Sequence, residues 1–216
     1  IFRTQLPRWP KGGITLSSNF DGNINQEPDY ILFPSCSSRV LAADESGTSS
    51  YEYLSKIAQS AHIKINMMDD YSMQCCGMAF ESGGHKEVAK DMNLDLVHRL
   101  KEETRHGEIP IVIDMSPCTY FLRESNSNLT FLDSVQFLSI IKDKLDLSPM
   151  DESYYVHPVC SSQKMGSGDD LVSLAQLCAS SIESPMEPFA VGPVVIGVYV
   201  FRNCRRMLYL SRSMVL

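Results

Sequence analysis

The sequence predicts an α/β fold made of two related βαβ-type units with largely parallel sheets, the second unit being incomplete. Short apolar segments alternate with longer segments in which apolar residues recur at helical spacing, which is typical of parallel strands joined by helices. A short motif also occurs twice, as Phe33–Ser38 (FPSCSS) and His157–Ser162 (HPVCSS), each directly after a predicted strand. We therefore expect two copies of one unit, divided in the polar stretch around residues 147–153.

The first unit is expected over residues 30–150, after a linker or arm rich in Pro, Gly, Asn and Ser at residues 1–29. Its elements are predicted in the order strand, helix, strand, helix, strand, helix. They are Tyr30–Phe33, a helix carrying Leu54, Ile57, Ala58 and Ala61, the alternating segment His62–Met67, a helix over 85–104, Ile111–Ile113 and a helix over 135–145.

The partial second unit is expected over residues 151–189. A strand is predicted at Tyr154–Val156, and an apolar face at helical spacing predicts a helix from Leu171 to Ile182. We interpret Cys178, which lies on that face, as a core residue.

Composition excludes several classes of function. The net charge of −7 repels nucleic acid and anionic lipid, so neither is an expected partner. The longest apolar stretch, Val194–Phe201, is too short for a transmembrane segment. The chain begins at Ile1, which we interpret as the start of a fragment. An odd number of cysteines, seven, favours thiol or metal chemistry in a reducing intracellular compartment, cytoplasmic or mitochondrial.

The cysteines follow the predicted strands. Cys36, Cys118 and Cys160 each come just after one strand, and Cys75-Cys76 follows another strand and a polar turn. Ligands of open α/β sheets bind at that edge, so Cys36, Cys75, Cys76 and Cys118 are expected to converge there. Four thiolates suit zinc or an iron–sulfur cluster. Adjacent cysteines favour a cluster, because each thiolate then binds a different iron. The alternative interpretation is a set of buried small apolar residues or an oxidation-prone pair.

Four segments carry a resemblance to a known family: Leu32–Cys36 (LFPSC), Cys75–Phe80 (CCGMAF), Asp114–Cys118 (DMSPC) and His157–Ser162. They resemble the duplicated cysteine-rich CCG domain of heterodisulfide reductases and of the iron–sulfur parts of glycolate oxidase, anaerobic glycerol-3-phosphate dehydrogenase and FAD-linked D-lactate dehydrogenases. The similarity covers residues 30–189 and is greatest to the last group.

The resemblance implies metal ligands in both copies. Cys36, Cys75, Cys76 and Cys118 match the first copy, which can hold a 4Fe–4S cluster, possibly non-cubane, in the family, and Cys160 matches the second copy. Met115 stands where the family has a further cysteine, and a thioether is a weak ligand.

The function implied is that of a fragment of a D-lactate dehydrogenase-like flavin and iron–sulfur oxidoreductase, an enzyme that oxidises a 2-hydroxy acid with a cytochrome or quinone as acceptor. The cysteine-rich module would pass electrons from the FAD domain to the electron acceptor. Its partners would be the FAD and ferredoxin-like domains of the same parent chain; the fragment itself would bind no FAD and have no lactate-oxidising activity. Two alternatives stay open: a metal-free structural or docking module, and a heterodisulfide-type thiol redox site.

Residues 190–216 are expected to be an out-of-frame tail. The second CCG motif should follow Phe189, but the chain reads Ala190-Val191-Gly192, and the adjacent reading frame of suitable codons encodes Cys-Cys-Gly. In that case Cys204 and the neighbouring arginines have no evolved function. The alternative is an apolar strand followed by a basic surface segment.

Overall fold

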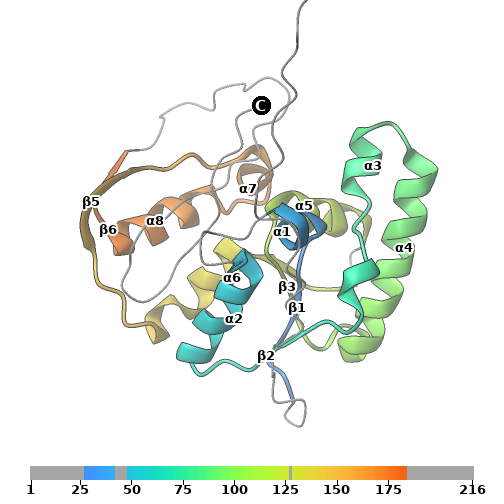
Figure 1. Cartoon of the computed structure of the whole chain (residues 1–216), viewed down its shortest axis with the longest axis horizontal. Coiled ribbons are helices and arrows are strands. Elements are labelled where there is room, and N and C mark those ends of the chain that lie inside the picture. Colours follow the sequence, from blue (N-terminus) through green and yellow to red (C-terminus); the bar gives the residue numbers. More distant parts are fainter. Residues whose placement is uncertain (1–26, 42–47, 127, 184–216) are drawn as a thin grey trace, which may run out of the picture.

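The computed structural model describes residues 27–41, 48–126 and 128–183. The arm before residue 27 and the predicted out-of-frame tail lie outside these residues. The described chain has a mixed α/β fold with two sheets of parallel strands, so the predicted fold class is confirmed (Figure 1). Within the described residues, no helix has the length and apolar character needed to cross a membrane.

The larger sheet has the strand order β2-β1-β3-β4 and is entirely parallel. Its strands are β1 (Tyr30–Phe33), β2 (Ile65–Met67), β3 (Ile111–Ile113) and β4 (Phe131–Asp133). In β1 and β3, Leu32 pairs with Val112, and both are fully buried. A parallel strand covered on both faces needs apolar residues throughout, which explains the uninterrupted runs that predicted these two strands.

Helices cover both faces of this sheet (Figure 1). They are α2 (Ser50–Ser60) and α6 (Ser134–Ile141) on one face, and α4 (Lys86–Glu103) and α5 (Ser116–Ser125) on the other. The short helix α1 (Cys36–Leu41) follows β1, and α3 (Met78–Ser82) packs beside α4. Single 3₁₀ turns lie at η1 (Tyr71–Met73), η2 (Arg105–Gly107) and η3 (Lys142–Lys144). Alternate residues of β1 point to opposite faces, so Leu32 packs with α2 and α6, whereas Phe33 packs with α4 and α5.

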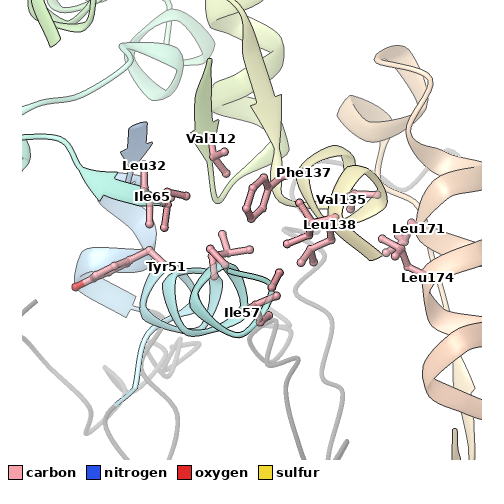
Figure 2. Close-up of a cluster of buried hydrophobic side chains, with 14 of the residues drawn as sticks. Leu32, Tyr51, Ile57, Ile65, Val112, Val135, Phe137, Leu138, Leu171 and Leu174 are labelled. Atoms are coloured by element: carbon pink, nitrogen blue, oxygen red, sulfur yellow. The ribbon is translucent and has the colours of Figure 1, made fainter. Parts of the chain in front are cut away.

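The second unit contributes a small parallel sheet of β5 (Met150–Tyr155) and β6 (Ala179–Glu183), with α7 (Cys160–Lys164) and α8 (Gly168–Cys178) between them. The apolar face of α8 joins the buried cluster that α2 and α6 form against the larger sheet. Figure 2 shows this cluster running from Leu32 and Tyr51 through Phe137 and Leu138 to Leu171 and Leu174. Residues 150–183 and the larger sheet therefore share one hydrophobic core.

Two predicted helices end earlier than expected. The helix predicted over 135–145 ends at Ile141, where the 3₁₀ turn η3 follows. The helix expected to reach Ile182 ends at Cys178, and Ile182 lies in β6. The backbone becomes extended at Ala179 (φ −140°, ψ 148°), where β6 begins to pair with β5. Cys178 is fully buried in the shared core, which confirms its predicted place.

Glu103, at the end of α4, carries a pH-dependent contact with the loop that follows β2. Its carboxylate accepts the backbone N–H of Asp69, at 3.0 Å to Oε1. Burial, followed by the charges of Asp69 and Asp70, raises the pKa of Glu103 to about 7, although this hydrogen bond and Arg99 act in the opposite direction. In the unfolded chain the pKa of a glutamate returns to its ordinary value, near 4.3.

Because the folded state binds this proton more tightly, the stability that Glu103 contributes is present at low pH and is lost as pH rises through about 7. Glu103→Gln removes the titration and keeps an acceptor oxygen. We expect the free energy of unfolding to fall between pH 5 and pH 7.5 by about 1 kcal/mol more in the unmodified chain than in the variant, a value reduced for solvent screening. Urea unfolding at both pH values measures it, and an identical pH dependence in the two proteins would contradict the assignment.

Candidate metal centre

Cys36 lies at the carboxyl edge of the larger sheet, as the first residue of α1 directly after β1. The segment before it is held by Asp114, which follows β3. The Asp114 carboxylate is buried and accepts hydrogen bonds from the Ser35 N–H (2.8 Å), the Ser38 hydroxyl and the Ser50 hydroxyl (2.9 Å). Burial raises the pKa of Asp114, and these donors counteract the rise. One carboxyl group thus fixes the beginnings of α1 and α2 relative to β3.

Cys75 and Cys76 lie on the loop that leads from η1 into α3. Gly77 follows in the left-handed conformation (φ +89°), with the backbone of Ala89 in α4 packed against its Cα. The buried Asn93, also in α4, donates to the Cys76 carbonyl at 3.3 Å. The Gly77 N–H points back at the Cys75 sulfur, at 3.4 Å. The glycine therefore allows the close approach of α4, and its N–H donates to the sulfur of Cys75.

Cys118 lies in the first turn of α5, after β3. It is buried in the same apolar cluster as Cys76, on the face of the sheet covered by α4. Met115, directly before α5, packs against the apolar cluster that also contains Cys76 and Cys118.

The structure brings the four cysteines of the first copy together. The thiol groups of Cys36 and Cys75, of Cys75 and Cys76, and of Cys76 and Cys118 lie close enough to influence one another's ionisation. Cys76 and Cys118 are buried, whereas Cys36 and Cys75 are partly exposed at the edge. The centre thus has an apolar interior and an opening toward solvent.

The electrostatics of this set favour negative charge on Cys75. Hydrogen bonds with Cys36 and Cys76, the Gly77 N–H and the charge of Arg39 lower the pKa of the Cys75 thiol against the effect of burial. A hydrogen bond with Cys75 and burial raise the pKa of Cys36. Hydrogen bonds with Cys118 and Cys75, together with burial, raise the pKa of Cys76.

The four cysteines are candidate ligands, because thiolate sulfur binds both zinc and the irons of iron–sulfur clusters. Within the described ranges, no three or more His, Cys, Asp or Glu side chains are arranged as a site for one metal ion. The four sulfurs form a series of pairwise contacts, with two of them on consecutive residues. Thiolates are the usual ligands of iron–sulfur clusters, in which each binds a separate iron atom.

Cys160 lies apart from this set in its exposure and contacts. It is the exposed first residue of α7, a helix that packs beside α5. The hydroxyl oxygens of Ser116 and Ser161 are 2.8 Å apart across this contact. In the described part of the chain, no interaction links the Cys160 sulfur with the four cysteines of the first copy.

Sequence reasoning missed three residues around the centre. Asp114 was recognised only as part of a resembling segment, although an acidic residue directly after a buried strand signals a polar role at the edge. Asn93 interrupts the apolar face of α4, which was the available signal for its buried contact. Arg39 carried no signal, because its partners lie in another loop.

Comparisons with known proteins give no match: neither a family model, nor a curated protein, nor a solved structure resembles the chain at a significant level.

Proposed function

We propose that the chain is the cysteine-rich module of a D-lactate dehydrogenase-like flavin and iron–sulfur oxidoreductase, passing electrons from the FAD domain of its parent chain to an acceptor. The observation that carries the proposal is the convergence of Cys36, Cys75, Cys76 and Cys118 at the carboxyl edge of the parallel sheet. The segments that carry these four cysteines come from positions far apart in the sequence, so their convergence depends on the fold of the whole first unit.

In this role Cys36, Cys75, Cys76 and Cys118 would hold an iron–sulfur cluster, which supplies reversible one-electron transfer when bound. The chain's own residues set the surroundings. The apolar cluster around Cys76 and Cys118 limits water on one side. The Gly77 N–H donates to the Cys75 sulfur on the other side. Burial and hydrogen bonds to sulfur are two of the means by which a protein adjusts a cluster's reduction potential.

A heterodisulfide-type thiol redox site is the second candidate. Its support is the partly exposed Cys75, whose lowered pKa favours the thiolate, in contact with the partly exposed Cys36. A protein thiolate attacks the disulfide and expels one thiolate, which leaves a mixed disulfide. A neighbouring protein thiolate then attacks the protein sulfur of that bond, forms an intramolecular disulfide and expels the second thiolate. This function needs two accessible thiols, whereas the cluster uses all four.

Anaerobic reconstitution of the full chain with ferrous iron and sulfide separates the two functions. We expect visible sulfur-to-iron charge-transfer absorption, an EPR signal in one oxidation state, and about four irons per chain. Protein whose cysteines are alkylated under denaturing conditions and then refolded is the control and should take up no cluster. If the unmodified chain gives neither absorption nor an EPR signal yet reduces a small disulfide with two thiol equivalents, the cluster function is wrong and the thiol function stands.

A further inference from the structure

Arg39 connects the two segments that carry the exposed pair of cysteines. From α1, its Nε donates to the carbonyl of Ser35 at 3.3 Å, its Nη1 to the carbonyl of Tyr71 at 2.5 Å, and its Nη2 to the carbonyl of Gln74. The guanidinium also lies over the Tyr71 ring, 5.8 Å from the centroid. Ser35 directly precedes Cys36, and Gln74 directly precedes Cys75. A single planar group therefore holds the backbone next to both cysteines.

This geometry requires an arginine. The rigid fork of the guanidinium reaches carbonyls on two segments at once, whereas an ammonium is a compact point charge on a flexible chain. A lysine at position 39 would keep the charge but could not reproduce the three directed contacts. We call the three directed hydrogen bonds of Arg39 the clamp. Substitution can therefore separate the effect of the clamp from the effect of the positive charge.

The charge of Arg39 is not neutralised by the groups that it contacts. All three hydrogen-bond acceptors are backbone carbonyls. In residues 27–41, 48–126 and 128–183, no carboxylate forms an ion pair with it. The guanidinium is close enough for its charge to act on the sulfurs of Cys36 and Cys75. A positive charge next to an anionic centre stabilises most the state that carries more negative charge.

We propose that Arg39 is a positioning residue that clamps the Cys36 and Cys75 segments together and, through its positive charge, raises the reduction potential of the centre that these cysteines hold. The second part rests on the proposed iron–sulfur function; the first part concerns the protein alone. Reduction adds an electron to a thiolate-ligated cluster that is already anionic, so a fixed cation favours the reduced form.

Arg39→Lys and Arg39→Gln test the two parts in the full, reconstituted chain. We expect both variants to release iron to a chelator faster than the unmodified protein, because both lose the clamp. The midpoint potential of the bound cluster should fall in Arg39→Gln and stay near the original value in Arg39→Lys. A merely structural role would not separate the two variants in potential, so equal potentials in all three proteins would overturn the charge part.

Arg123→Gln is the matched control. Arg123 also directs its guanidinium at a backbone carbonyl, that of Phe131 (2.9 Å from Nε), but the structure places it beside Asp133 and not among the cysteines. Its substitution should lower stability without moving the cluster potential. A shift in Arg123→Gln as large as that in Arg39→Gln would show that the potential responds to general loosening, which contradicts the proposal.

If the unmodified chain binds no cluster, the proposed function is refuted, but the clamp can still be tested. The alkylation rates of Cys36 and Cys75 in the metal-free chain, measured by peptide mapping, then test it. Faster alkylation of both cysteines in Arg39→Lys and Arg39→Gln, with the rate at Cys160 unchanged, supports the clamp. Unchanged rates at Cys36 and Cys75 overturn it.

Discussion

Gly77→Ala is expected to lower the free energy of unfolding by about 3 kcal/mol or more. Two causes add. An alanine at φ +89° adopts a left-handed conformation that is unfavourable by about 1 kcal/mol. Its Cβ would also lie 2.4 Å from the carbonyl oxygen of Ala89, which is part of the α4 backbone and cannot rotate away. Relieving this clash moves either α4 or the loop carrying Cys75 and Cys76.

Gly84→Ala is the matched control for that prediction. Gly84 has nearly the same conformation, φ +83°, but no atom lies within 4 Å of a Cβ built there. The free energy of unfolding of Gly84→Ala should fall only by the cost of the left-handed conformation, about 1 kcal/mol. Urea unfolding of both variants isolates the close approach of α4 as the difference between the losses. Equal losses would show that α4 does not pack tightly against Gly77.

Asp114→Ala is expected to lower the free energy of unfolding by about 3 kcal/mol. The variant leaves the buried Ser35 N–H without an acceptor, and the hydroxyls of Ser38 and Ser50 lose theirs as well. It also leaves a cavity at the junction of α1, α2 and β3. Because Ser35 precedes Cys36, the loss of stability should be accompanied by weaker retention of the cluster.

Asp114→Asn keeps the volume and one acceptor oxygen, so it is the control for cavity formation. The remaining oxygen can accept from the Ser35 N–H, and the new amide can donate to the serine hydroxyls, which also act as acceptors. We expect a loss of about 1 kcal/mol, measured by urea unfolding alongside the alanine variant. If the asparagine variant were as unstable as the alanine variant, the carboxylate charge, and not the hydrogen-bond network, would be the stabilising feature.

The sequence was most informative where a residue pattern and its tertiary surroundings agree. The apolar runs of β1 and β3 predicted strands because both faces of those strands are buried. The repeated Cys-Ser-Ser segments also have the same structural role. Cys36 begins α1 shortly after β1, and Cys160 begins α7 shortly after β5. The predicted repeat therefore corresponds to a repeated local structure.

Elements that depend on distant contacts were missed. β4 is only three residues long and contains Asp133, so no alternation was visible, and its extended form depends on pairing with β3. α5 begins with Ser116 and Pro117 and was not predicted, although proline is well suited to the first turn of a helix. The helix predicted to reach Ile182 failed for the same reason, because β5 pairing overrides the helical spacing after Cys178.

The residues of the candidate site were also predictable only where local features of the sequence determine their positions. Strand ends are local features, so the convergence of Cys36, Cys75, Cys76 and Cys118 followed from the predicted parallel order. The residues that hold them in place did not, because Arg39 bonds to a carbonyl 35 positions away and Asp114 to an amide 79 positions away. Such pairs become visible only when the chain is folded.

The most direct test of the ligand set compares iron retained by Cys118→Ser and Cys160→Ser after anaerobic reconstitution. Cys118 is a buried member of the contacting set, whereas Cys160 is exposed and outside it. Cys118→Ser should lose most of the iron and the charge-transfer absorption, whereas Cys160→Ser should keep both at the level of the unmodified chain. Equal iron retention by the two variants, or a larger loss in Cys160→Ser, would contradict the assignment of the four first-copy cysteines as one centre.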